Sequence, residues 1–315
     1  MSLISAPRLE GTITVREGRK LGFAEFGPLG GRPIVWLHGT PGARRQIPEA
    51  ARVAAFELGV RIIGIDRPGV GLSTPHLYDR VLDFTEDLAI VFDVLELDRL
   101  AMIGLSGGGP YALATASALP DRVAAVGILG GVVPTKGEEA IPGGLVGKLS
   151  PLGPFIPFLR VPLAALFTNI VRVLRPVGGP VLDLYARFSP EGDRLVFGRP
   201  EIKAMFLDDL IGNGRRGLGA PISDFILFTR PWGFSLAGIR TPVVWWHGDS
   251  DNIVPLAHAL AAVPLLPDAE LRVRPGESHL GGLGAAEEVI ITLLELWDRG
   301  DRARKPVRKP VGAVR

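Results

Sequence analysis

Residues 102–113 read MIGLSGGGPYAL. This stretch places Ser106 between glycines, after an apolar run typical of a buried strand and before a run typical of a helix. In so sharp a turn the central side chain projects beyond the end of the strand. Small residues two positions before and after it let strand and helix approach closely, and Gly104 and Gly108 meet that need. The stretch predicts either a nucleophilic serine or an ordinary glycine-rich turn.

Apolar runs and helix-like stretches alternate on both sides of this turn. The predicted strands cover residues 33–38, 61–66, 100–105, 122–131, 242–247 and 270–274, with two shorter strands joined at residues 17–18 before them. The predicted helices cover residues 50–58, 83–97, 108–118, 255–263 and 285–297. Strands that alternate with helices at this spacing form a parallel sheet with right-handed crossovers. We therefore expect an α/β fold, with a mostly parallel central sheet and helices on both faces.

The alternation stops between residues 134 and 236, where proline, glycine and amphipathic pieces replace it. We expect a core made of residues 1–133 and 237–298, with residues 134–236 as a helical insertion. Residues 299–315 carry seven basic residues and one acidic residue, a net charge of +6, whereas the whole chain has +2. The basic character therefore belongs to this tail, which we expect to be disordered, and we expect no nucleic-acid partner.

Composition narrows the class of protein further. Hydrophobic residues make up 47% and charged residues 22%, which allows a large core and excludes global disorder. The chain has no cysteine, and residues 1–11 lack the apolar segment of a secretory signal. Lys148, Arg160 and Arg172 divide the most apolar region into short uncharged runs that contain prolines. We expect these runs to be too short and broken to span a membrane, and the protein to be cytoplasmic.

A second glycine-rich loop, HGTPG at residues 38–42, follows the first strand of the parallel set. A tetrahedral oxyanion needs two or more hydrogen-bond donors already directed at it. The backbone N–H groups of Thr40 and Gly107 can supply them, because both loops lie at the same edge of the sheet. The alternative is a tight turn between strand and helix. His38 is better explained as a structural histidine that supports this loop than as a base.

Two later loops offer an acid and a base. HGDSDNIVP, residues 247–255, contains Asp249 and Asp251, either of which could orient a histidine, while the other caps the following helix. His279 is the only one of the five histidines that follows this acid in the sequence and lies in a loop after the last strand. A serine nucleophile needs such a base, and the base needs an orienting acid. The order Ser, Asp, His therefore favours a nucleophilic site over separate turns.

Together, HGTPG, DRPGVGLST, GLSGGGP, HGDSDNIVP and GESHL resemble the α/β-hydrolase superfamily over most of the chain, from about Gly11 to Trp297. The resemblance implies a Ser106–His279–Asp251 catalytic triad, with Asp251 as the last residue of a G-x-x-D motif. It also implies an oxyanion hole formed by the N–H groups of Thr40 and Gly107. The insertion lies where the family carries its lid.

Departures from the family pattern limit the reaction. Relatives that dehalogenate or open epoxides use an aspartate where this chain has Ser106. HGTPG and RPGVGLSTP resemble proline iminopeptidases, but those enzymes usually carry a tryptophan at the position of Gly107. Cofactor-free perhydrolases usually have a bulky residue there as well.

The leading interpretation is a serine hydrolase that cleaves a carboxyl ester of a small to medium, apolar molecule. The alternatives on the same triad are an aminopeptidase, a carbon–carbon-bond hydrolase and an acyltransferase. A non-catalytic ligand-binding protein of the same fold is a further alternative. We expect a small-molecule ester or amide substrate, and neither a cofactor nor a metal. The sequence leaves the natural substrate and the oligomeric state open.

Overall fold

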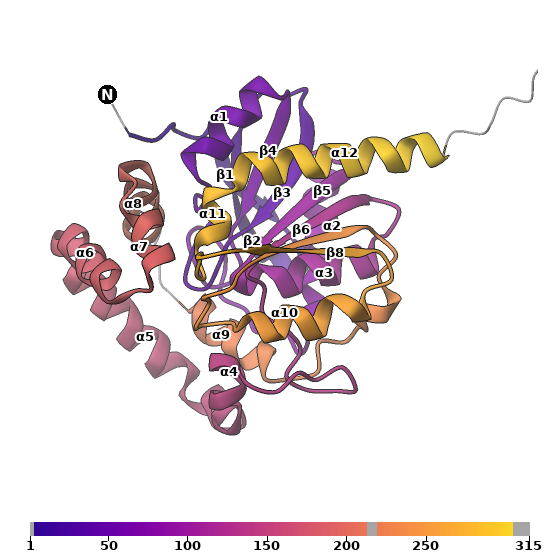
Figure 1. Cartoon of the computed structure of the whole chain (residues 1–315). Helices are drawn as coiled ribbons and strands as arrows, with labels where there is room; N and C mark the ends of the chain where they lie inside the picture. Colours follow the sequence, from indigo (N-terminus) through magenta and orange to yellow (C-terminus); the bar gives the residue numbers. More distant parts are fainter. Residues whose placement is uncertain (1–2, 213–218, 305–315) are drawn as a thin grey trace, which may run out of the picture.

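Eight strands form one sheet at the centre of the molecule (Figure 1). The computed structural model describes residues 3–212 and 219–304. The strands are β1 (Leu9–Thr14), β2 (Lys20–Phe26), β3 (Arg32–Leu37), β4 (Val60–Ile65), β5 (Leu100–Leu105), β6 (Val123–Leu129), β7 (Val243–Gly248) and β8 (Ala269–Arg274). Their order is β1-β2-β4-β3-β5-β6-β7-β8. The pairs β1–β2 and β2–β4 are antiparallel and all others are parallel. The predicted mostly parallel sheet is confirmed.

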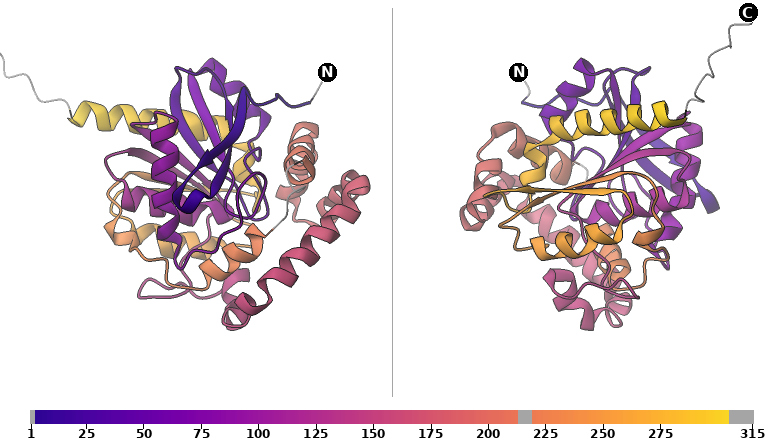
Figure 2. Two further views of the ribbon diagram at one scale, coloured as in Figure 1. Left: turned by 180° about the vertical axis from the view of Figure 1, so that it is seen from behind. Right: turned by 45° about the vertical axis from the view of Figure 1, so that its right-hand side comes forward.

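Helices cover both faces of the sheet, as Figure 2 shows from two sides. One face packs against α2 (Phe84–Val94), α3 (Gly109–Ala118) and α10 (Leu256–Ala262). The other packs against α1 (Glu49–Glu57), the short α11 (Gly281–Gly284) and α12 (Ala286–Arg304). The parallel strands are buried along their whole length, apart from the edge strand β8 and the start of β3. This burial explains why they appear in the sequence as continuous apolar runs.

The segment between β6 and β7 is an insertion made mostly of helices. It contains α4 (Gly144–Leu149), α5 (Ile156–Leu174), α6 (Gly178–Phe188), α7 (Glu191–Phe197), α8 (Pro200–Phe206), a π-helical turn (Leu207–Gly212) and α9 (Ala220–Phe228). Figure 1 shows α5 to α8 projecting to one side of the sheet. The bounds of the insertion and its role as a lid remain predictions.

Helix α5 differs from the sequence expectation of a broken apolar region. A single helix of 19 residues runs through Pro162. An interior proline removes one backbone hydrogen bond, but here it does not end the helix, which packs against α9. By length and composition alone α5 is long and apolar enough to cross a membrane.

The C-terminal helix also extends further than expected. We expected disorder from residue 299, but α12 continues to Arg304. Two ion pairs attach its last turns to the core, Arg32 with Asp298 and Arg99 with Asp301. The rest of the predicted tail, residues 305–315, lies outside the described residues.

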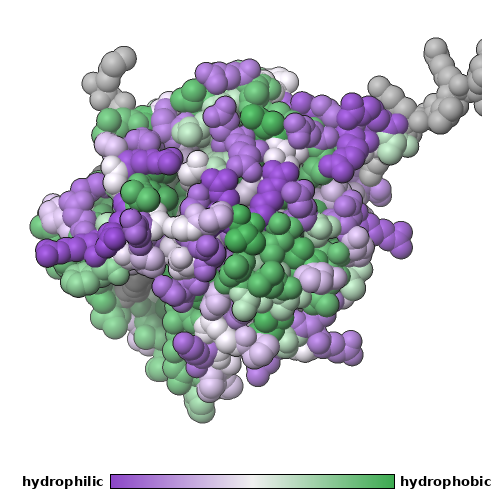
Figure 3. Space-filling model, in the orientation of Figure 1, coloured by the Kyte–Doolittle hydropathy of each residue, from purple (hydrophilic) through white to green (hydrophobic). Residues whose placement is uncertain are grey.

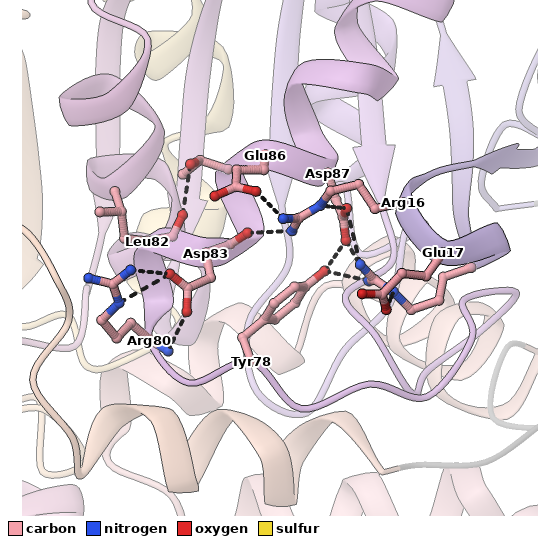
Figure 4. A network of polar contacts seen from close by, with 10 residues as sticks. Arg16, Glu17, Tyr78, Arg80, Leu82, Asp83, Glu86 and Asp87 are labelled. Atoms are coloured by element: carbon pink, nitrogen blue, oxygen red, sulfur yellow. Dashed lines mark hydrogen bonds and ion pairs between the residues drawn. The ribbon is translucent and has the colours of Figure 1, made fainter.

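A polar network fastens the β1–β2 turn to the start of α2 (Figure 4). Arg16 Nε and Arg19 Nη1 donate to the two oxygens of Asp87, at 2.6 Å and 2.5 Å, and Tyr78 donates to the same carboxylate. Burial alone would raise the pKa of Asp87, but the hydrogen bonds from Arg16, Tyr78 and Arg19 bring it below its usual value. The network fixes the β1–β2 turn, which lies beside the carboxyl end of β4.

Candidate active site

Ser106 occupies a strained turn between β5 and α3. Its φ is +50°, in the left-handed region that costs a non-glycine residue energy. The surrounding glycines are required by close packing. A Cβ on Gly104 would lie 2.7 Å from the Cα of Gly109, and one on Gly108 would lie 2.2 Å from the carbonyl oxygen of Leu37. The turn therefore keeps Ser106 at the carboxyl end of the parallel strands, where the other loops converge.

Three predicted site residues form one hydrogen-bonded chain. The distance from Ser106 Oγ to His279 Nε2 is 2.8 Å, and that from His279 Nδ1 to Asp251 Oδ2 is 2.7 Å. The carboxylate accepts the Nδ1–H, which leaves Nε2 free to accept the proton of the serine hydroxyl. All three side chains are buried, but Ser106 and His279 both border a cavity. A serine nucleophile with a histidine base and an orienting acid would need this arrangement.

The structure distinguishes the two aspartates that the loop pattern left open. Asp251 Oδ1 accepts the backbone N–H groups of Ile253 and Val254, both at 2.9 Å. Burial raises the pKa of the Asp251 carboxyl, but the hydrogen bonds from His279 and from this backbone lower it by more. The pKa of Asp251 therefore lies below its usual value. Asp249 is exposed, and among the described residues it accepts from Ser250 and from the N–H of Gly276.

Thr40, predicted to donate its N–H to an oxyanion, lies against Gly107 beside the serine. A Cβ on Gly107 would lie 2.3 Å from Thr40 Oγ1, so the Thr40 side chain occupies the space that a larger residue at 107 would need. The Thr40 hydroxyl donates to Asp224 Oδ2 at 2.6 Å and accepts from Arg67 Nη2 at 2.8 Å. The absence of a bulky residue after Ser106 therefore has a physical cause.

Arg67 is the centre of a buried polar network under the HGTPG loop. Its guanidinium pairs with Asp224 at 2.7 Å and donates to the carbonyl oxygens of His38 and Gly39. Tyr111 donates to the other oxygen of Asp224 at 2.7 Å. His38 accepts the N–H of Arg67, and burial, together with the Arg67 charge, holds the pKa of His38 well below its usual range. His38 is thus placed as a structural residue.

Three buried carboxylates of the insertion hold the loops of the site. Asp193 in α7 accepts the N–H of Leu280, next to His279, at 2.9 Å. Asp209 in the π-helical turn accepts the N–H groups of Ala43 and Arg45, at 2.7 Å and 3.0 Å. Asp224 in α9 holds Thr40, as described above. Sequence reasoning missed these residues. Asp224 alone had a signal in the sequence, because it is a single carboxylate in an otherwise apolar stretch that is predicted to be helical.

The cavity beside Ser106 has a volume of about 260 Å³ and mostly apolar walls. The core contributes the loops of Thr40, Ser106 and His279, together with Ile253. The insertion contributes Leu182, Tyr185, Phe197 and Phe206. Among the described residues that line it there is no aspartate or glutamate. In the described part of the chain, no group of three or more His, Asp or Glu side chains is placed to hold a metal ion.

Asp209 gives a pH-dependent prediction for stability. Burial, reinforced by the nearby Asp66, raises the pKa of Asp209 to about 7. A carboxyl group whose pKa is higher in the folded protein takes up a proton on folding. Its contribution to stability therefore decreases as pH rises from about 4 towards 7.

The melting temperatures of Asp209→Asn and wild type should be measured from pH 5 to pH 8. The difference, variant minus wild type, should grow by on the order of 5 °C over this range, because only the wild type loses stability through Asp209 as pH rises. The buried histidines are common to both proteins and cancel in this difference. A difference that stays constant with pH would contradict the prediction.

Comparison with known proteins agrees with this fold. The model of the α/β-hydrolase fold family matches residues 32–148. A non-heme haloperoxidase from Rhodococcus erythropolis is 30% identical over 275 residues, covering 85% of this chain and 92% of that protein. A non-heme chloroperoxidase from Streptomyces lividans is 29% identical over 287 residues, covering 89% and 96%. A solved esterase from Exiguobacterium antarcticum superposes with a TM-score of 0.67 at 19% identity, covering 92% and 100%.

The chain belongs to the α/β-hydrolase fold superfamily. Its relatives support the assignment of the protein as a hydrolase. The superfamily predicted from the motifs is confirmed. The roles of Ser106, Asp251, His279, Thr40 and Gly107 remain predictions, for which the geometry above provides the basis.

Proposed function

We propose that the protein is a serine carboxylesterase that acts on small to medium esters with an apolar acyl group. The observation that carries this proposal is the combination of the Ser106–His279–Asp251 hydrogen bonds with an apolar cavity. An aminopeptidase must bind the free ammonium group of its substrate, and a buried cation needs an anionic partner. The described lining of the cavity offers no carboxylate, which favours an ester over an aminoacyl amide.

The proposed reaction has two halves. Ser106 Oγ attacks the ester carbonyl carbon while His279 Nε2 takes the hydroxyl proton, and the N–H groups of Thr40 and Gly107 stabilise the oxyanion. The intermediate collapses, and the alcohol leaves with the proton from His279. Water then attacks the acyl-serine with His279 again as base, which releases the acid and restores the hydroxyl. Asp251 keeps the imidazole in the required tautomer throughout.

A fluorophosphonate probe and a substrate screen test this proposal. The probe should label Ser106, as located by peptide mass spectrometry, and p-nitrophenyl esters should be hydrolysed far faster than aminoacyl p-nitroanilides. Labelling with faster amide cleavage would overturn the ester assignment. Failure to label Ser106 would overturn the assignment of the nucleophile.

The names of the two relatives favour a second candidate, oxidation of halide with peroxide. On this site hydrogen peroxide would replace water in the second half-reaction, so that the acyl-serine becomes a peracid and the peracid oxidises the halide. Bromination of phenol red in acetate, bromide and hydrogen peroxide tests this activity. Activity that disappears in Ser106→Ala would support it, and activity that persists would contradict it.

Chain-length dependence tests the role of residues 134–236 as a lid that lines the acyl site. An apolar channel gains up to about 0.8 kcal/mol for each buried methylene, so kcat/KM should rise about three- to fourfold per CH₂ until the cavity is full. Two leucines of α6 provide a matched pair, since Leu182 lines the cavity and Leu184 is exposed. In a p-nitrophenyl series from acetate to decanoate, Leu182→Ala should reduce the gain per CH₂, and Leu184→Ala should not. A steady fall with length from acetate would contradict this role.

The side chain of Thr40 should position its own backbone N–H. Thr40→Val removes the hydroxyl that bonds to Asp224 and Arg67, and we expect kcat to fall about tenfold to a hundredfold with little change in KM. Thr40→Ser keeps the hydroxyl and should retain most of the activity. Steady-state kinetics on one ester separates the two parameters. A loss confined to KM, or an equal loss in both variants, would contradict the role in the oxyanion site.

A further inference from the structure

Exposed apolar side chains are concentrated in one part of the insertion. Among the described residues, 26 large apolar side chains are exposed, and 16 of them lie within residues 145–195. Phe158 is 85% exposed and Phe188 is 81% exposed. Figure 3 shows hydrophobic residues gathered along the lower left edge, over α4 and α5. Soluble monomers rarely expose apolar area on this scale without a binding partner. We call the region from α4 to α6, residues 144–188, the apolar surface.

Helix α5 departs from the pattern of an ordinary surface helix. A surface helix turns its apolar side to the core and its polar side to water. In α5 the apolar side chains of Phe158, Val161 and Val173 are exposed to 85%, 72% and 74%, while Arg160 is only partly exposed. The exposed side of α5 can therefore make apolar contacts with a partner.

The charge of this region indicates which partner it fits. Within the apolar surface, residues 144–188, the chain has one acidic residue, Asp183, and five basic residues, Lys148, Arg160, Arg172, Arg175 and Arg187. Exposed apolar side chains in a segment with a net charge of +4 favour an anionic lipid surface. A second copy of the chain would bring the same cations face to face, which disfavours self-association through this region.

The geometry of the insertion indicates that α5 lies along a membrane instead of crossing it. The N–H of Leu145 at the start of α4 donates to the carbonyl oxygen of Ile253, and α5 itself packs against α9. Both contacts hold the apolar surface against the body of the protein. Helix α6 connects this surface to the site, because Leu182 lines the cavity while Leu184 and Phe188 are exposed.

We propose that the apolar surface docks the protein on anionic phospholipid bilayers, with α5 in the plane of the interface. Binding of this kind requires no catalysis, so the proposal stands or falls separately from the proposed function. It places the apolar cavity next to a source of apolar molecules.

Vesicle flotation with the full chain tests the docking. Wild type should bind phosphatidylcholine vesicles that contain 30% phosphatidylglycerol and should bind pure phosphatidylcholine much less. Phe158→Ser with Val173→Ser should weaken binding to the anionic vesicles at least tenfold, because two exposed apolar anchors are lost. Phe56→Ser is the matched control, since Phe56 is an exposed apolar residue on α1, and it should bind as wild type does.

The remaining outcomes also decide the proposal. Arg160→Gln with Arg172→Gln should reduce the preference for phosphatidylglycerol. Circular dichroism and fluorophosphonate labelling of each variant show whether it is folded with an intact site. Binding retained by the Phe158/Val173 variant would attribute it to the basic C-terminal segment and overturn the proposal. If wild type does not bind vesicles, the proposal is wrong. It is also wrong if wild type forms a dimer that the Phe158/Val173 variant does not form, because the apolar surface would then be a self-association site.

Discussion

Replacing Ser106 with alanine is expected to lower kcat by about 10⁴-fold or more and to leave the fold intact. Ser106 Oγ is the atom 2.8 Å from His279 Nε2, so alanine removes the nucleophile while the base and acid remain in place. The positive φ at this position strains serine and alanine alike, so the turn should survive the change. The measurement is steady-state hydrolysis of the best p-nitrophenyl ester, with circular dichroism to check folding.

Ser250→Ala serves as the control for this experiment. Ser250 is exposed in the loop that carries the acid, and its hydroxyl donates only to the neighbouring Asp249. Its activity should be within about twofold of wild type. If Ser106→Ala keeps more than about a tenth of wild-type activity, Ser106 is not the nucleophile.

Asp251→Asn is expected to lower kcat by about 10⁴-fold, whereas Asp249→Asn should change it less than threefold. The Asp251 carboxylate accepts the Nδ1–H of His279 at 2.7 Å, and an amide can present its NH₂ group there instead. The imidazole would then carry its proton on Nε2, where it cannot accept the proton of Ser106. Asp249 is only two positions before Asp251 in the sequence, but its carboxylate bonds to the N–H of Gly276 and not to the imidazole.

The ratio of the two variants' kcat values is the decisive quantity. Both substitutions remove one negative charge from the same loop, so a general electrostatic effect would affect them similarly. If Asp249→Asn is the more damaging change, the acid has been misassigned.

The strands, the core helices and the order of the loops could be predicted from the sequence. Each buried parallel strand appears in the sequence as a continuous apolar run, and the turn at its end contains glycine, proline or aspartate. These two patterns are enough to predict where the strands lie. The motifs around Ser106 and His279 could be found in the same way, because the residues that constrain a sharp turn lie next to each other in the chain. Residue pattern alone left Asp249 and Asp251 equivalent, and only the resemblance to a family favoured Asp251.

Local periodicity and short motifs were enough to predict the α/β sheet and the candidate loops, because both leave a pattern within a few consecutive residues. The tertiary structure was needed to show which aspartate reaches His279, how Asp193, Asp209 and Asp224 hold the loops of the site, and that α12 continues to Arg304. It was also needed to show that α5 continues through Pro162 with apolar side chains exposed. The physical reason is that these features depend on contacts between residues far apart in the chain. The partner of Asp224 in the site, Thr40, lies 184 positions away.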